Sequence, residues 1–328
     1  MSFKLSRRNF TAGSAALAGA AMLPLGSAQA QATVLRYGNA GNIDTLSNQF
    51  NLRLADTLME RTNDELGMEI FAGTLGGEQS LIEGMSLGTL DMYNGAYTGT
   101  REFDILYSPY FFRDGAHAGA VMAGAIGDQA SQVLQERYDA RLLGVGRLGT
   151  YNLMLKEPIS SIEEIAGRKI RTPQIEGCIA SVESLGANPT PVAFNEVYLA
   201  LQQGVVDGLV TALNVAVAVQ FYEVCQYVVA NDFGQALDKQ LISNASWNGL
   251  SADQQNVLAT SFSELEEEYY YAAGVAAKPN DLAAWEEANG EGSVITLDED
   301  LNSVFADLNR SLADDVYGEG AWEEIQQA

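Results

Sequence analysis

Residues 195–207 read Asn-Glu-Val-Tyr-Leu-Ala-Leu-Gln-Gln-Gly-Val-Val-Asp, and this stretch decides the fold class. Asn195 is predicted to cap a helix that runs through Gln203. Gly204 is predicted to end that helix, because glycine adopts the left-handed conformation at a helix C-terminus without steric cost. Val-Val-Asp at 205–207 then predicts a returning strand. A helix followed directly by a strand indicates an α/β fold.

The residues before this stretch predict the preceding elements of the same unit. Ser161 and Glu164 are spaced as a capping box, which predicts a short helix that Gly167 ends. Residues 169–172, Lys-Ile-Arg-Thr, follow as a strand. Pro173 terminates this strand because proline has no backbone N–H to donate to a sheet. The whole segment therefore alternates helices and strands.

A second unit of the same design is predicted nearer the N-terminus. Phe50, Leu54 and Leu58 repeat every four residues, which predicts an amphipathic helix. The unit also contains predicted strands at 34–37 and 68–71, a helix at 79–87 ended by Gly88, and a returning strand at 90–92. Both units end in Gly-x-(Leu/Val)-Asp, at residues 88–91 and 204–207, an offset of 116 residues. We therefore expect two similar α/β lobes rather than one large sheet.

The C-terminal part of the chain is predicted to be helical. Ser251 and Gln254 form a second capping box. The helix that they open is expected to run past Tyr271, long enough to lie across both lobes. Residues 300–313 and 321–327 predict two acidic helices.

Residues 1–30 are interpreted as an export signal that is not part of the fold. They contain Lys4, Arg7 and Arg8 and no acidic residue, then an apolar run from residue 12 to residue 25, then Ala-Gln-Ala as a cleavage signature. The residues around the two arginines resemble the twin-arginine export motif. A short membrane anchor is the alternative, but the apolar run is too short and alanine-rich to span about 30 Å of hydrocarbon. No later stretch approaches ~18 consecutive apolar residues, so we expect a soluble protein in the periplasm.

The composition is that of a globular and strongly acidic protein. Apolar residues make up 47% and charged residues 19% of the 328 residues, which excludes a disordered chain. Acidic residues outnumber basic ones 43 to 18, and the net charge of -25 becomes -28 when the three cations of the signal are removed. Such a charge repels phosphate backbones, so no nucleic-acid partner is expected.

Residues that usually carry catalysis are scarce. His117 is the single imidazole and lies in a predicted loop that enters a helix, so we do not expect it to be catalytic. Cys178 and Cys225 with one histidine cannot build the usual zinc sites, and they form either one disulfide or two buried thiols. The glycines at 73–77 lack the Gly-Lys-(Ser/Thr) of a phosphate loop. Acidic runs such as 266–268 are interpreted as solvated helix faces, and no metal or cofactor is expected.

Arg171 is the most informative cation in a chain with few of them. It lies at the end of the strand predicted at 169–172, where an α/β lobe normally presents its ligand. A guanidinium group there can hold a carboxylate through two parallel charge-assisted hydrogen bonds. The alternative is an internal salt bridge to one of the many acidic residues, and position alone does not decide between the two.

Several long motifs connect the two predicted units to one family. They are Gly-Arg-Lys-Ile-Arg-Thr-Pro at 167–173, Leu-Gly-Ala-Asn-Pro-Thr-Pro at 185–191, the run 194–208, Phe-Tyr-Glu-Val at 221–224 and, upstream, residues 75–78, 87–92 and 109–114. With these motifs the chain closely resembles the solute-binding proteins of tripartite ATP-independent periplasmic (TRAP) transporters, of the C4-dicarboxylate-binding type. The similarity covers nearly the whole mature chain.

The resemblance implies a two-lobed periplasmic binding protein fold of α/β class, type II-like, with hinge strands and a long helix that spans the lobes. We expect lobe 1 to comprise 31–148 plus about 237–276, and lobe 2 to comprise 149–236 plus about 277–328. The implied function is that of a receptor that closes on a small organic acid and delivers it to the large and small TRAP membrane subunits. We expect a monomer.

The resemblance also implies ligand-binding residues. Arg171 would be the carboxylate-binding arginine, and Phe194 would pack on the ligand from the second lobe. A second arginine common in the family is replaced by Tyr151, with Arg147 as a substitute, and Thr211 stands where an asparagine often binds the ligand. The remaining candidates are Asn39, Glu78 and Asn214. These departures argue against sialic acid and simple C4-dicarboxylates as ligands.

Two other functions fit a two-lobed α/β protein. A secreted enzyme is one, because a fold alone does not determine function. A binding protein of an ABC importer or of a sensor kinase is the other, although it would lack the motif at 194–208. The scarcity of catalytic residues favours a receptor over an enzyme.

Overall fold

The computed structural model describes residues 32–328, so the predicted export signal lies outside the described residues. The strands are β1 (Thr33–Asn39), β2 (Leu66–Ala72), β3 (Met92–Gly95), β4 (Ala140–Leu155), β5 (Lys169–Thr172), β6 (Asn188–Pro191), β7 (Gly208–Ala212), β8 (Tyr227–Ser243) and β9 (Val294–Ile295). The helices are α1 (Leu46–Arg61), α2 (Glu78–Ser86), α3 (Arg101–Asp104), α4 (Gly115–Met122), α5 (Ala125–Tyr138), α6 (Glu176–Ser184), α7 (Val197–Gln202), α8 (Leu213–Ala218), α9 (Asn244–Gly249), α10 (Ala252–Leu265), α11 (Ala272–Asn289), α12 (Leu301–Tyr317) and α13 (Ala321–Gln327).

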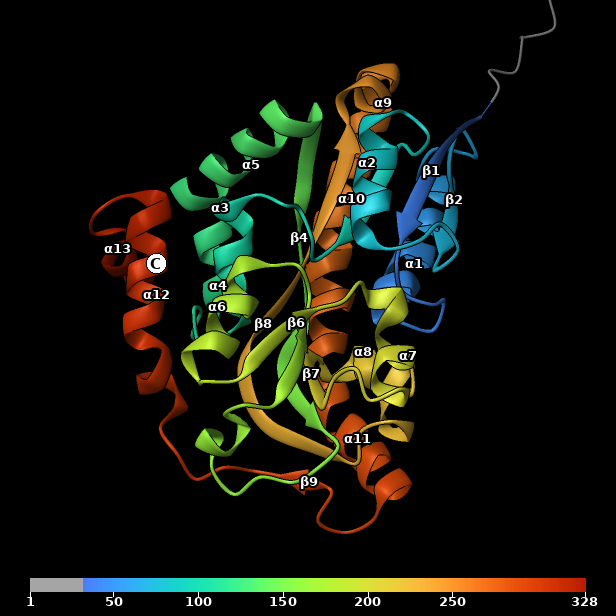
Figure 1. Cartoon of the computed structure of the whole chain (residues 1–328). Helices are drawn as coiled ribbons and strands as arrows, with labels where there is room; N and C mark the ends of the chain where they lie inside the picture. The colour runs from blue at the N-terminus through green and yellow to red at the C-terminus, as the bar shows by residue number, and fades with distance from the viewer. Residues whose placement is uncertain (1–31) are drawn as a thin grey trace, which may run out of the picture. The chain divides into compact units, whose positions relative to one another are not determined.

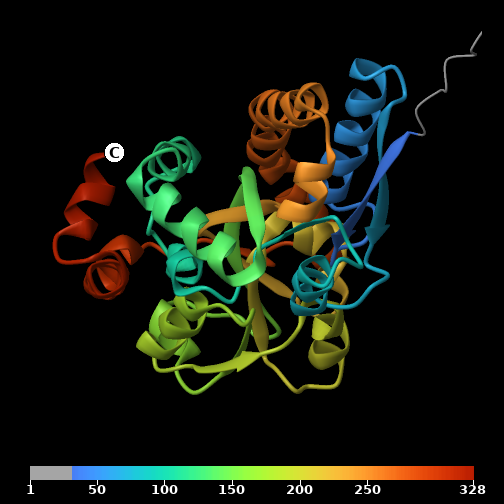
Figure 2. The ribbon, with the colours of Figure 1, turned by 90° about the horizontal axis from the view of Figure 1, so that it is seen from above.

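Two α/β units share one nine-stranded sheet, whose order is β2-β1-β3-β8-β4-β7-β5-β6, with β9 beside β8. Parallel pairing joins β1 to β2 and β3 in one unit, and β5 to β6 and β7 in the other. The long antiparallel strands β4 and β8, of 16 and 17 residues, run through the middle of the molecule (Figures 1 and 2). The two expected units are therefore present, and one continuous sheet connects them because both long strands belong to each unit.

The internal repeat is visible in the hydrogen bonds of two aspartates. Asp91 donates its N–H to Arg36 O at 2.9 Å and accepts the N–H of Arg36 on its carboxylate at 2.8 Å. Asp207 donates to Lys169 O at 2.7 Å and accepts the N–H of Lys169 at 2.8 Å. Each aspartate thus connects the start of a returning strand to the strand beside it, which explains why both units end in the same motif.

Two predicted helix caps were wrong. Ser161 does not cap a helix, because residues 162–165 form a 3-10 turn and the Glu164 carboxylate accepts from the Ser160 hydroxyl instead. Asn195 does not cap α7, because a 3-10 turn over 194–196 precedes the helix.

The two returning strands also begin later than predicted. Pairing starts at Met92 instead of residue 90, and at Gly208 instead of residue 205. The N–H groups of Leu90 and Val205 are bonded back to the preceding helices, at Gly84 O and Ala200 O, and so cannot join the sheet.

The second capping box was predicted correctly, and the long helix was too. Ser251 accepts from the backbone of Gln254, and the Gln254 side chain accepts from the backbone of Ser251. The helix then continues through α10, a π-helical segment at Glu266–Tyr271 and α11. The π-helical segment is where the helix approaches β4, because Glu266 bonds to Arg147 there.

The imidazole of His117 is buried and hydrogen-bonded on both ring nitrogens. His117 Nε2 donates to Ile325 O at 2.6 Å and Nδ1 accepts the N–H of Arg113 at 3.0 Å. Cys178 and Cys225 are free buried thiols that belong to different hydrophobic clusters.

Across residues 32–328 no helix is both long and apolar enough to span a membrane, and no group of three or more His, Cys, Asp or Glu residues suits a metal ion.

Candidate ligand-binding site

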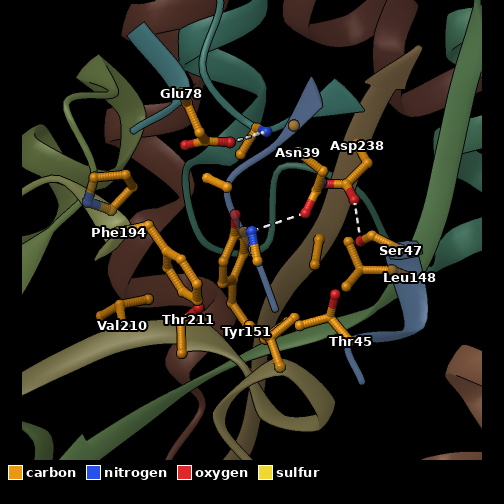
Figure 3. A pocket seen from close by; sticks show the side chains of 18 of the residues that line it. Asn39, Thr45, Ser47, Glu78, Leu148, Tyr151, Phe194, Val210, Thr211 and Asp238 are labelled. Atoms are coloured by element: carbon orange, nitrogen blue, oxygen red, sulfur yellow. Dashed lines mark hydrogen bonds between the residues drawn. The ribbon is translucent and has the colours of Figure 1, made fainter. Parts of the chain in front are cut away.

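A cavity of about 620 Å³, including its open side, lies where the two units meet at β4 and β8. Six of the eight predicted site residues line it: Asn39, Glu78, Tyr151, Arg171, Phe194 and Thr211. Figure 3 shows Glu78, Asn39 and Asp238 on one side of the cavity and Phe194, Val210 and Thr211 on the other. Both units therefore contribute to its walls.

Arg171 is held in the cavity wall by the backbone of the neighbouring loop. Its Nε and Nη2 atoms both donate to Val192 O, at 3.0 and 2.9 Å, which fixes one edge of the guanidinium group. The side chain is buried, with 3% of the residue exposed. None of the ion pairs among residues 32–328 includes Arg171, so the alternative of an internal salt bridge is wrong for the described residues. The Nη1 edge remains free for an anion.

Burial without a counter-ion lowers the pKa of the Arg171 guanidinium. Desolvation lowers the pKa of its guanidinium to about 10, although the charges of Glu78 and Tyr151 act in the opposite direction. A buried cation without a partner is costly, and a ligand carboxylate would remove much of that cost. The electrostatics of the site therefore favour a bound anion.

Arg147 does not line the cavity. Its Nε and Nη2 atoms donate to the two carboxylate oxygens of Glu266 at 2.9 and 2.6 Å, and Nη2 also donates to Glu267. The guanidinium lies 4.0 Å from the centre of the Tyr271 ring. The described structure thus pairs the expected substitute arginine with the long helix, and it leaves Arg171 as the cation in the cavity lining.

Asn214 does not line the cavity either. Its Nδ2 atom donates to Leu148 O at 2.6 Å, and its buried Oδ1 atom has no partner among the described residues. Because Leu148 lines the cavity, the hydrogen bond from Asn214 helps to position the backbone of this wall residue, although Asn214 itself is not part of the lining.

The aromatic and polar wall comes from β4, β7 and the loop before α7. Tyr151 on β4 is paired with Ala212 on β7, and burial raises the pKa of its hydroxyl well above the usual value. Phe194 packs edge-on against Phe221 with ring centres 6.1 Å apart. Thr211 precedes Ala212 on β7. This wall offers an aromatic surface and two hydroxyl groups, of Tyr151 and Thr211, to a ligand.

The side-chain amide of Asn39 is hydrogen-bonded to other residues of the protein through both its oxygen and its nitrogen. Its Oδ1 atom accepts from the N–H of Gly41 at 2.8 Å and from Asn48 Nδ2 at 3.0 Å, while its Nδ2 atom donates to Asn94. The residue therefore shapes the loop after β1 at the cavity wall.

The sequence analysis missed Asp238, which lines the cavity from the middle of β8. Ser47, Thr45 and Val215 also line it and were not predicted. A signal for Asp238 was present, because the adjacent charges of Asp238 and Lys239 interrupt a strand that is otherwise mostly buried and apolar.

The cavity continues toward solvent through a mouth that shares Glu78, Arg171 and Phe194 with it. Across the mouth, Gly77 of the first unit lies so close to Asn195 of the second that a Cβ atom on the glycine would be 3.2 Å from Asn195 Oδ1. A second contact between the two units is an exposed hydrogen bond, which Asn42 Nδ2 donates to Ala218 O at 3.4 Å. The two units thus touch in front of the cavity.

Comparison with known proteins identifies the family. The model of the family described as bacterial extracellular solute-binding protein, family 7 (DctP), matches residues 38–319. The chain belongs to this family. Its members are substrate receptors of TRAP transporters and not enzymes, which excludes the two alternative functions, and they are periplasmic.

Two relatives of this DctP-family receptor carry informative names. It is 31% identical to a solute-binding protein of Roseobacter denitrificans over 262 residues, 78% of this chain and 80% of the relative. It is 30% identical to the 2,3-diketo-L-gulonate-binding periplasmic protein YiaO of Escherichia coli over 257 residues, 76% of each chain.

A solved structure extends the likeness to the whole fold of this DctP-family receptor. The TRAP periplasmic solute-binding protein of Roseobacter denitrificans with bound L-galactonate superposes with a TM-score of 0.79 at 26% identity, covering 90% of this chain and 98% of that one. The two-lobed binding-protein fold predicted from the sequence is therefore confirmed.

Proposed function

We propose that this receptor binds a hydroxylated monocarboxylate of the sugar-acid type, with Arg171 as the carboxylate anchor. The observation that carries the proposal is the buried guanidinium of Arg171, which belongs to the cavity lining and whose Nη1 atom has no hydrogen-bond or ion-pair partner among the described residues. The ligand bound in the Roseobacter denitrificans structure and the name of the Escherichia coli relative support the ligand class, because galactonate and 2,3-diketo-L-gulonate are both six-carbon acids with a single carboxylate.

The remaining contacts follow from the cavity lining. Phe194 would pack against the carbon chain of the ligand, and Tyr151 and Thr211 would offer hydroxyl groups to it. Arg147 and Asn214 would act indirectly, by fixing β4 and Leu148.

We also propose that the receptor is a monomer whose lobes comprise 31–148 plus about 237–276, and 149–236 plus about 277–328. The register of β4 and β8 supports this division, because a shift lies between Arg147 and Gly149 where β8 passes from Leu237 to Ala236. This extra residue in β4, one of three shifts in its pairing with β8, is a natural place for a hinge. The closed receptor would then deliver its ligand to the large and small membrane subunits.

A thermal-shift screen of aldonates, uronates, dicarboxylates and amino acids tests the proposed ligand class. A ligand present at ~100 times its Kd adds about 2.7 kcal/mol of stability, which is a readily measured rise in Tm. Stabilisation by at least one aldonate or uronate supports the proposal. Stabilisation by amino acids or by dicarboxylates alone would refute it.

A further inference from the structure

The charges that face the cavity are unevenly distributed. Arg171 is its lining cation, and two carboxylates, Glu78 and Asp238, line it as well. No ion pair within residues 32–328 joins either carboxylate to Arg171. A ligand carboxylate bound to Arg171 therefore leaves two acidic groups for the rest of the ligand.

Asp238 presents one oxygen to the protein and the other to the cavity. Its Oδ2 atom accepts from Ser47 Oγ at 2.5 Å, from Tyr270 OH at 2.6 Å and from Asn94 Nδ2 at 3.4 Å. These three donors fix the orientation of the carboxylate. Its Oδ1 atom accepts no hydrogen bond from the described residues, and Figure 3 shows the side chain beside Ser47 at the cavity wall.

Glu78 repeats this arrangement at the start of α2. Its Oε1 atom accepts from the N–H groups of Ala96 at 2.6 Å and Tyr97 at 3.4 Å, and from Tyr93 OH at 3.3 Å. Its Oε2 atom accepts no hydrogen bond from the residues described. Two anchored carboxylates in the cavity lining thus each keep an oxygen without a hydrogen bond from the described residues.

The neighbouring cation, Lys239, does not neutralise the carboxylates of Glu78 and Asp238 through an ion pair among the described residues. Lys239 follows Asp238 on β8, so its side chain leaves from the other face of the strand. Its Nζ atom donates to Tyr107 OH at 2.5 Å and to Ala96 O, and it forms no ion pair with Glu78 or Asp238 among the described residues. The free oxygens of both carboxylates are therefore available to donors on a ligand.

We infer that Asp238, together with Glu78, is a specificity determinant that accepts hydroxyl groups of the ligand and excludes a second carboxylate. The inference rests on the proposed anchoring of one ligand carboxylate by Arg171. A hydroxyl group supplies a hydrogen to each free oxygen, and a site built for such donors discriminates strongly against a ligand that lacks them. A second carboxylate supplies no hydrogen and adds like-charge repulsion. At about 6 Å and an effective dielectric constant near 20 this repulsion amounts to roughly 100-fold in affinity.

The test uses two pairs of acids that differ only at the far end of the chain. L-Galactonate and D-erythronate carry a terminal CH₂OH group, and galactarate and meso-tartrate carry a carboxylate in its place. Calorimetry on the mature receptor should show that at least one monocarboxylate binds about 100-fold or more tightly than its dicarboxylate partner. In Asp238→Asn and in Glu78→Gln this ratio should fall about 10-fold or more, because each change removes one repelling charge and keeps the shape.

Asp56→Asn is the matched control, since Asp56 is an exposed acid on α1 whose loss changes the net charge equally. It should leave the ratio unchanged. A wild-type receptor that binds both members of a pair equally, or a ratio that neither Asp238→Asn nor Glu78→Gln alters, would overturn the inference. If one of these two results were found and Arg171→Ala nevertheless abolished binding, the inference would fail and the proposed function would stand. If none of the four acids bound at millimolar concentration, both would fail.

Discussion

The guanidinium of Arg147 and the carboxylate of Glu266 form a two-point ion pair that ties β4 to the π-helical segment of the long helix. Both side chains are only 10% exposed. Glu266 Oε1 also accepts the backbone N–H of Arg147 at 3.0 Å, so the pair fixes the main chain as well as the side chains. Since Leu148 and Tyr151 follow on the same strand, this pair positions a wall of the cavity without touching it.

Breaking this pair should destabilise the fold strongly. Arg147→Met would leave the Glu266 carboxylate buried without its partner, at a cost of about 3 to 5 kcal/mol in the free energy of unfolding. The double variant Arg147→Met/Glu266→Leu should recover part of this loss. Urea unfolding measures both, and Lys278→Met provides the control.

Lys278 pairs with Asp232, and the two side chains are 33% and 41% exposed, so the control should lose no more than about 1 kcal/mol. Equal losses in Arg147→Met and Lys278→Met would contradict the assignment of a structural role to Arg147.

Arg171 should govern ligand affinity. Arg171→Ala is expected to weaken binding of the acid found in the screen by roughly 2 to 5 kcal/mol, because a buried carboxylate would lose its partner. Arg171→Lys should recover only part, since an ammonium group cannot reproduce the planar fork. Lys169→Ala removes a cation from the exposed part of the same strand and should change calorimetric affinity little. A folded Arg171→Ala variant that binds within threefold of wild type would remove Arg171 from the site.

Asp104 should make stability depend on pH. Its carboxyl is buried and its Oδ1 atom has no partner among the described residues. Burial raises its pKa to about 7, although the charge of Lys239 opposes the shift. A raised pKa means that the folded state holds this proton more tightly than the unfolded state does. Its contribution to stability is therefore present below about pH 4 and is lost as the pH rises toward 7.

The expected result is a change in the difference between wild type and Asp104→Asn. Relative to the Asn variant, wild type should lose on the order of 4 kcal/mol between pH 4 and pH 8, as measured by urea unfolding at each pH. Asp56→Asn, at an exposed position, should show no such trend. A difference that is constant over this range would show that Asp104 titrates normally.

Much of the fold was predictable because its signals are local. Gly204 and Asp207 repeat the roles of Gly88 and Asp91, with φ angles of 74° and 78° at the two glycines and matching hydrogen bonds at the aspartates. Such features depend on a few neighbouring residues. The failed capping box at Ser161 shows the limit, because Glu299, 137 residues away along the chain, accepts the N–H of Ile162.

The site was predictable only where a side chain belongs to a motif. Arg171 and Phe194 lie in the long run that resembles the family, and both line the cavity. Asp238 was missed because its orientation depends on Ser47 and Tyr270, which are 191 and 32 residues away in the sequence. The partner of Arg147 was equally hidden, since 43 acidic residues were available to it and only the folded chain selects Glu266.

Closure of the mouth should require a residue without a side chain at position 77. In Gly77→Val the Cβ atom would be 3.2 Å from Asn195 Oδ1 and 3.4 Å from the Cβ of Ala193, and the two methyl groups would extend further into the second unit. We expect about 10-fold weaker ligand binding, or roughly 1.4 kcal/mol, with little change in the Tm of the ligand-free protein. Small-angle scattering at saturating ligand should show a larger radius of gyration than wild type.

Ser86→Val adds the same side chain at an exposed position on α2 and should bind as wild type does. Unchanged affinity and unchanged scattering in Gly77→Val would mean that the contact between Gly77 and Asn195 is not needed for closure.

Added salt should stabilise this receptor while weakening ligand binding little. The chain has a net charge of -25, or -28 without the three cations of the predicted signal, so its surface carboxylates repel one another. That repulsion acts over distances that salt screens, because the Debye length is about 10 Å at 0.1 M, whereas a carboxylate bound to Arg171 would be in direct contact inside a buried cavity. Melting temperature should therefore rise from about 0.05 to 1 M sodium chloride, and the association rate of an anionic ligand should hold or increase.

Sucrose at matched osmolality controls for general solute exclusion, which also favours compact states. A Tm that falls and an association rate that slows steadily with salt would show that attraction between surface charges outweighs repulsion, and the electrostatic argument would then be wrong.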